Sequence, residues 1–206
     1  MESSLKNMVV VLATITLVAS AAVGGVYTIT KEPIAKAKAA AVENALKQVL
    51  PAFEATTSQT VEVNDMPIIA HTATASGKAV GYAVESMSKN GFGGAVRLMV
   101  GFDTKGTILN INVLEQKETP GLGTKMAEEN NPLLLSFKDK KGYELKMTVR
   151  KDGGDIDALT AATISSRAYA EAVAIAYEAY EVACGWQKEA DDVATGATKQ
   201  EGGKNE

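Results

Sequence analysis

Hydrophobic residues are concentrated in one uninterrupted run near the start of the chain. No charged residue occurs from Asn7 to Thr30, and Met8–Tyr27 consists mostly of Val, Ala, Leu, Ile, Thr and Gly. A helix needs about 20 predominantly apolar residues to cross the hydrocarbon core of a bilayer. The pattern therefore predicts an N-terminal tail at residues 1–7 and a transmembrane anchor at residues 8–30.

A cleaved signal peptide is the alternative interpretation of this run. Lys6 precedes it, and Ala19-Ser20-Ala21 has the small-x-small form of a cleavage site. The uncharged stretch continues past that site to Thr30, which favours an uncleaved anchor. Lysines lie on both sides of the span, so the charge pattern leaves its orientation open.

A helical pattern follows the apolar run. Pro33 stands where the first turn of a helix tolerates proline, and Pro51 stops the pattern after Leu50. A polar stretch, Ala55–Gln59, separates this helix from the next segment. We therefore assign residues 31–60 to a linker helix and loop.

After the linker, the hydrophobic period shortens to two, as in strands, and the runs end at Gly, Asn or Asp. The predicted strands are Thr60–Val63, Ile68–Ala75, Ala79–Glu85, Ala95–Phe102, Ile108–Leu114 and Tyr143–Val149. A short helix is expected within Met126–Phe137. A long Ala-rich helix should run over about Ala161–Ala183, with Gly185 as the residue that ends it.

These elements place the chain in the α+β class. We expect a single N-terminal transmembrane helix followed by one sheet-plus-helices domain at residues 61–186. Residues 187–206 have almost no large apolar side chain and predict a disordered tail.

Composition excludes several classes of function. A net charge of -4 and an aromatic content of 5% argue against a nucleic-acid partner. The single cysteine, Cys184, and the single histidine, His71, do not supply the ligands of an iron–sulfur cluster, a c-type haem or a structural zinc. We expect no metal site, so any redox chemistry would need an organic cofactor.

The start of the long helix carries the most informative motif. Asp157 or Thr160 can cap the helix, and small residues at positions 161 and 162 leave the approach to Thr163 open. Free N–H groups and the positive end of the helix dipole suit an anionic phosphate, which Arg167, one turn beyond Thr163, could reach. The alternative is a capped core helix with spare hydroxyl groups.

A second segment, Glu118–Lys125, places a glycine on each side of Leu122, which would let the backbone approach a flat ligand. It is not a Walker A loop, because Thr124 rather than Lys follows the second glycine. It is not a dinucleotide fingerprint either, because Met126 stands where the third glycine is needed. Taken alone, the segment could be a simple turn.

The helix-start motif resembles the Asp-x-x-(Ser/Thr)-x-Ala-Thr signature of FMN-binding domains, in which a flavin transferase joins FMN to the last Thr. The resemblance implies FMN bound covalently, through its phosphate, to Thr163. Ala161 departs from the family, which often has Gly there. The matching residues are Asp157, Thr160, Ala162 and Thr163, continued by Ser165 and Arg167.

The glycine segment is similar to the Glu-Thr-Pro-Gly-Leu-Gly loop of the same family, which implies contact with the isoalloxazine ring. A weaker match is Asn90-Gly91-Phe92-Gly93-Gly94, where a hairpin turn is the alternative. The residues that the resemblance places at the ring are Glu118, Thr119, Gly121, Leu122 and Gly123.

The order of anchor, linker helix, strands, glycine loop and threonine motif resembles the G subunits of Rnf complexes, which are ion-translocating ferredoxin:NAD oxidoreductases. The resemblance implies a relay of electrons through FMN, without a complete active site on this chain alone. The implied partners are the other membrane and peripheral subunits, a flavin transferase during maturation, and membrane lipid. The FMN domain would lie on the extracytoplasmic side of the cytoplasmic membrane.

Two alternatives stay open at the level of sequence. The chain could be the related FMN-domain subunit of a sodium-translocating NADH:quinone reductase. It could also be an anchored binding module without a cofactor, which uses the glycine loop to hold a partner.

Overall fold

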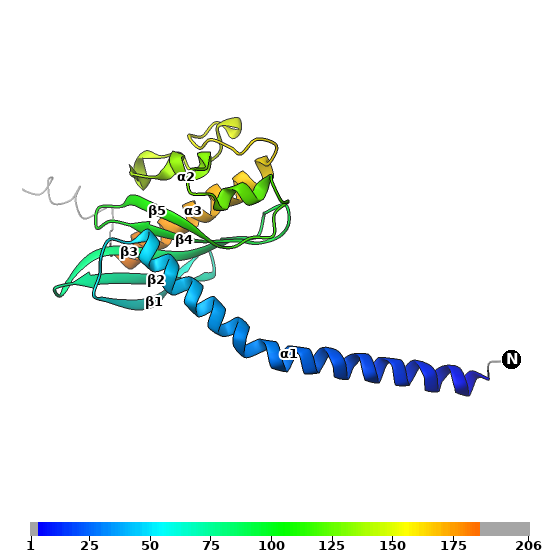
Figure 1. The fold of residues 1–206 in the computed structure, drawn as a ribbon. Helices are drawn as coiled ribbons and strands as arrows, with labels where there is room; N and C mark the ends of the chain where they lie inside the picture. Colours follow the sequence, from blue (N-terminus) through cyan, green and yellow to red (C-terminus); the bar gives the residue numbers. More distant parts are fainter. Residues whose placement is uncertain (1–3, 186–206) are drawn as a thin grey trace, which may run out of the picture. The chain divides into compact units, whose positions relative to one another are not determined.

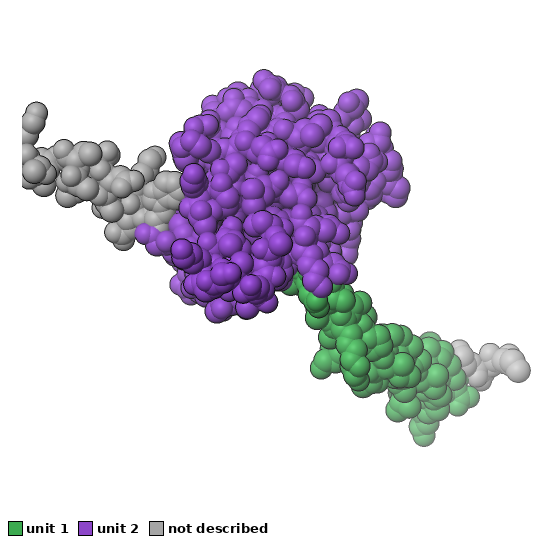
Figure 2. Space-filling model, turned by 60° about the vertical axis from the view of Figure 1, so that its left-hand side comes forward, with its two compact units in different colours: residues 1–43 green, residues 44–206 purple. Residues whose placement is uncertain are grey.

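The computed structural model describes residues 4–185 (Figure 1). The chain divides into two compact units, residues 1–43 and 44–206 (Figure 2). Trp186 and the expected disordered tail at residues 187–206 lie outside the described residues.

The anchor and the linker helix form one continuous helix, α1 (Leu5–Val49, 45 residues), which is long and apolar enough to cross a membrane. At 1.5 Å per residue it is about 68 Å long, roughly twice the hydrocarbon thickness of a bilayer. The expectation that a separate helix begins at Pro33 is wrong, because Pro33 lies inside α1. Proline removes one backbone hydrogen bond, and the helix propagates on both sides of that gap.

A six-stranded antiparallel sheet with strand order β1-β2-β3-β4-β5-β6 forms the centre of the second unit (Figure 1). Positive φ angles at Asn64-Asp65 and at Ser76-Gly77 form the tight turns that join the first three strands. This sheet and its helices confirm the α+β fold class. The strands are β1 (Ala55–Val63), β2 (Met66–Ala75), β3 (Lys78–Ser88), β4 (Val96–Phe102), β5 (Thr107–Glu115) and β6 (Lys140–Lys141).

Two expectations about the strands are wrong. Residues 55–59, interpreted as a polar linker, belong to β1, since pairing with β2 supplies the partner that their polar sequence did not reveal. The strand predicted at Tyr143–Val149 is absent. A 3₁₀ turn, Gly142–Glu144, begins there instead, and a Cβ at Gly142 would overlap the ring of Tyr177. Packing against that ring sets the path of this segment.

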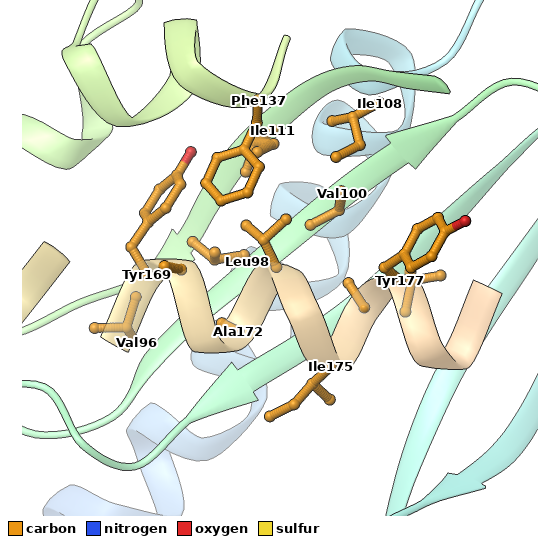
Figure 3. Packing of buried hydrophobic residues seen from close by; sticks show 14 of the residues in the cluster. Val96, Leu98, Val100, Ile108, Ile111, Phe137, Tyr169, Ala172, Ile175 and Tyr177 are labelled. Atoms are coloured by element: carbon orange, nitrogen blue, oxygen red, sulfur yellow. The ribbon is translucent and has the colours of Figure 1, made fainter. Parts of the chain in front are cut away.

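Helix α3 (Thr163–Ala183) covers one face of the sheet and closes the hydrophobic core (Figure 3). Fully buried alanines, such as Ala172, let the helix approach strand β4, which carries Leu98 and Val100. The rings of Phe102 and Tyr180 stack with their centroids 4.7 Å apart. As expected, Gly185 is the C′ residue after the end of α3, and it has a left-handed conformation at φ +66°.

The last turn of α1 belongs to the second unit and packs on the sheet. Ala45, Leu46 and Val49 are buried, and a Cβ at Gly101 of β4 would overlap the backbone of Val49. Asn110 of β5 also donates a hydrogen bond to a carbonyl of this turn. The C-terminal end of α1 is therefore part of the folded domain.

The short helix expected within residues 126–137 is α2 (Pro132–Phe137), preceded by a 3₁₀ turn, η1 (Gly123–Ala127). Asn131 caps α2, because its side-chain oxygen accepts a hydrogen bond from the N–H of Leu134 (2.9 Å). From α2, the hydroxyl of Ser136 accepts the N–H of Asp157 at 3.0 Å. This hydrogen bond ties the segment that leads into α3 to the rest of the fold.

Candidate functional site

Helix α3 begins at Thr163, and no side chain caps its N-terminus. The expectation that Asp157 or Thr160 caps the helix is wrong. Asp157 instead pairs with Arg150 at 2.5 Å, and both side chains are more than half exposed. The capping position is held by Ala162, which has no side-chain acceptor to offer. The free N–H groups at the start of α3 therefore remain accessible to a ligand.

Ser166 holds the turn before α3 from inside the helix. Its fully buried hydroxyl accepts the N–H of Leu159 (2.9 Å) and donates to the carbonyl of Ala162 (2.8 Å). Between these two residues, Ala161 adopts a left-handed conformation at φ +59°. Sequence reasoning missed this role of Ser166. The available signal was its position four residues after Ala162, from which a serine can bond back to the carbonyl.

A cavity of about 350 Å³ opens at the N-terminus of α3. Three segments that are far apart in the sequence form its walls: the loop around Phe92, the loop around Leu122, and the first residues of α3. Phe92, Leu122 and Ile164 are large hydrophobic side chains with 68%, 40% and 46% of their surface exposed. A cavity of this size with apolar walls suits a small organic ligand. The lining residues are Phe92, Thr119, Leu122, Gly123, Ala161, Ala162, Thr163, Ile164 and Ser165.

The structure brings together about half of the residues expected from the sequence. Thr119, Leu122, Gly123, Ala162, Thr163 and Ser165 line the cavity. Asp157, Thr160, Glu118, Gly121 and Arg167 do not line it. Phe92, which sequence reasoning raised only through a weak glycine–aromatic match, is a lining residue.

Arg167 forms a two-pronged ion pair outside the cavity. Its guanidinium donates to both carboxylate oxygens of Asp152, at 2.7 and 2.8 Å. The guanidinium holds the pKa of the Asp152 carboxyl below its ordinary value. This pair ties α3 to the 3₁₀ turn η3 (Arg150–Asp152), so the Arg167 side chain is already engaged.

The two glycines of the Leu122 loop serve the local fold. Gly121 adopts φ +75° and donates its N–H to the hydroxyl of Thr124 (2.9 Å), which closes the turn. At Gly123, a Cβ would lie 2.6 Å from the Cβ of Glu118 and 2.6 Å from the hydroxyl oxygen of Ser165. The close approach permitted by Gly123 is therefore to protein atoms behind the cavity wall, and not only to a ligand as the sequence suggested.

The chemistry of the cavity has two parts. The N–H groups of Thr163, Ile164 and Ser165 precede the first backbone hydrogen bond of α3, from Ser166 to Ala162. Together with the helix dipole, such groups favour a negative charge. The apolar walls favour a flat hydrophobic body. The arrangement therefore suits a ligand that joins an anionic group to an apolar ring.

Two families of known proteins match the chain. The FMN-binding domain matches residues 91–178, and the RnfG N-terminal region matches residues 1–49. The first of these ranges contains every residue that lines the cavity.

Several proteins are similar to the chain over most of its length. The G subunit of the ion-translocating oxidoreductase complex of Vibrio vulnificus is 36% identical over 157 residues, which are 70% of the chain and 74% of that protein. The protein of the same name from Shewanella amazonensis is 32% identical over 193 residues, 84% of the chain and 86% of that protein. The one from Vibrio atlanticus is 32% identical over 185 residues, 84% of the chain and 88% of that protein.

The chain belongs to this family of G subunits. The resemblance to FMN-binding domains and to the G subunits of Rnf complexes is thereby confirmed. FMN also fits the cavity, because its phosphate matches the free N–H groups of α3 and its ring system matches the apolar walls. Among residues 4–185, no group of three or more His, Cys, Asp or Glu side chains is placed to hold a metal ion.

Proposed function

We propose that this chain is a membrane-anchored flavoprotein subunit that relays electrons through FMN within an ion-translocating oxidoreductase complex. We further propose that the FMN is held covalently, by an ester between its phosphate and the hydroxyl of Thr163. The observation that carries the second proposal is the position of Thr163, which is the first residue of α3 and also lines the cavity. Its hydroxyl therefore lies beside the N–H groups that favour a phosphate.

The rest of the cavity has a role in holding the ring system. Phe92, Leu122 and Ile164 supply apolar surface, and Thr119 and Ser165 supply the polar groups of the lining. Residues of the motif that lie outside the cavity act on the turn before Thr163. Asp157 does so through its N–H bond to α2, and Arg167 through its pair with Asp152.

FMN supplies the redox chemistry, since a flavin accepts and donates electrons, while the protein binds and orients it and excludes water. An ester to Thr163 leaves the ring system free of covalent modification and keeps the cofactor from dissociating. The implied donor and acceptor chemistry belongs to other subunits of the complex.

The proposed partners follow from the family and from α1. They are the other subunits of the complex, a flavin transferase that forms the ester, and membrane lipid around residues 8–30. We place the FMN domain on the extracytoplasmic side, as the resemblance implies. The length and apolar composition of α1 support membrane insertion.

A pair of threonine substitutions tests the attachment. Thr163→Ala should abolish flavin fluorescence of the denatured chain in a gel, because the ester oxygen is gone. Thr119→Ala removes a hydroxyl from another wall of the same cavity and should leave that fluorescence in place. Fluorescence retained by Thr163→Ala would show that FMN is not attached there, and a denatured wild-type chain without flavin would refute covalent binding.

A further inference from the structure

The carboxyl group of Glu118 is buried behind the cavity wall. Only 5% of the residue is exposed, and it is not among the residues that line the cavity. One carboxyl oxygen, Oε1, accepts the N–H of Gly93 at 3.1 Å, and the other, Oε2, accepts the hydroxyl of Ser165 at 2.5 Å. Within residues 4–185, no Lys, Arg or His forms an ion pair with this group.

These two hydrogen bonds join the three walls of the cavity. Gly93 follows Phe92 in the first wall, and Ser165 follows Thr163 and Ile164 in the third. Glu118 itself begins the loop that carries Leu122, the second wall. Its own N–H donates to the side chain of Gln116 at 2.7 Å, which holds the start of that loop.

The space around the carboxyl group is filled by the chain. A Cβ at Gly91 would lie 2.6 Å from Oε1, and a Cβ at Gly123 would lie 2.9 Å from Oε2. A Cβ at Gly93 would overlap the carbonyl of Lys117. A buried polar group whose hydrogen bonds are all made by the protein restricts the motion of every segment that it joins. These glycines are the residues that permit so close an approach.

We propose that Glu118 is a positioning residue that fixes the separation of the three cavity walls through the length of its side chain. The inference rests on the proposed function, since the walls are those that would hold the flavin ring. Glu118 acts on the ring only through Phe92, Leu122 and the start of α3. The reach of the side chain, with an acceptor or donor at each branch, is the property that matters, rather than its charge.

Three substitutions separate reach from charge in the full chain, purified in detergent with its flavin. Glu118→Gln keeps the length, because its carbonyl can accept from Gly93 and its amide can donate to the hydroxyl oxygen of Ser165. Glu118→Asp keeps the charge and is one methylene shorter. Glu118→Ala removes both properties. Glu129→Ala, at an exposed carboxylate in the same half of the domain, is the matched control.

Amide hydrogen exchange and flavin fluorescence are the two measurements. In the Ala and Asp variants, exchange at residues 91–94 and 163–166 should rise about tenfold or more, because hydrogen bonds to a buried carboxyl group are lost. Quenching of the flavin fluorescence by iodide should rise with it, because the ring is held less tightly. The Gln variant and the control should stay close to wild type in both measurements.

Two patterns of results in these measurements would overturn the proposal. An Asp variant that resembles wild type while the Gln variant exchanges faster would show that charge, and not reach, is the property required. Variants that all resemble wild type would show that Glu118 holds nothing together. A wild-type chain without flavin would refute the proposed function instead. The amide hydrogen exchange of the variants would still decide the role of Glu118. If Glu118→Ala does not fold, the Asp and Gln pair gives the same decision.

Discussion

Ala161 is strained by its backbone conformation, and glycine at this position should relieve the strain. The residue has φ +59°, in the left-handed region that glycine adopts freely. It lies in the turn that leads into α3. We therefore predict that Ala161→Gly stabilises the domain, although most exchanges of alanine for glycine destabilise a protein.

The change in the free energy of unfolding on Ala161→Gly is the difference between two contributions. A left-handed conformation costs an L-residue about 1–2 kcal/mol, which glycine avoids. Glycine in turn loses more backbone entropy on folding, about 0.5–1 kcal/mol relative to alanine. Ala161 is exposed, so the lost methyl group buries little surface. The net change should be a stabilisation of about 0.5–1 kcal/mol, or roughly 1–4 °C in melting temperature.

Thermal unfolding of the full chain in detergent, followed by near-ultraviolet circular dichroism, measures this change. The matched control is Ala174→Gly, in the interior of α3, where the same exchange should cost about 1 kcal/mol. The two substitutions should thus move the melting temperature in opposite directions. If Ala161→Gly lowers it as much as the control does, the left-handed conformation is not a source of strain.

Two further predictions concern buried groups. Ser166→Ala leaves the N–H of Leu159 without its acceptor, so it should destabilise the domain by about 1–3 kcal/mol in urea unfolding. An unchanged unfolding midpoint would refute this role. Burial raises the pKa of Tyr169, and that of Tyr177 to about 12. The unfolded chain therefore releases these two protons first, near pH 10. The contribution of the two tyrosines to stability is thus complete below about pH 10 and is lost as the pH rises through their folded-state pKa values. Tyr169→Phe should raise the pH of alkaline unfolding; an unchanged or lower value would contradict this account.

The elements that the sequence predicted correctly are those with strong local signals. The uncharged run in α1 depends on composition alone, and the end of the strand at Ala75 depends on Gly77, which adopts a positive φ freely. The strands β2, β3 and β5 and the Ala-rich α3 also have a strong local pattern of apolar residues, and β4 is apolar enough to be buried along nearly its whole length. The errors fall where the local signal is weak or misleading. Residues 55–59 become a strand only because β2 lies beside them, and Tyr143–Val149 is diverted by the ring of Tyr177.

The cavity, too, was predicted from the sequence only in part. Sequence motifs located two of its walls, at Leu122 and at Thr163, and the FMN-binding family covers both. The motifs did not show which of their residues line the cavity. Arg167 pairs with Asp152, 15 positions away, and that pair depends on where the chain returns after η3.

The sequence by itself thus determined the apolar span of α1 and the order of most strands and helices. Each of these depends on residues within a few positions of one another, where composition and spacing act directly. Only the tertiary structure decided that α3 starts without a cap, that Phe92 completes the cavity, and that Glu118 joins the three walls. The bond from Ser165 to Glu118 spans 47 positions, so it exists only once the loops have been brought together by the packing of α3 on the sheet.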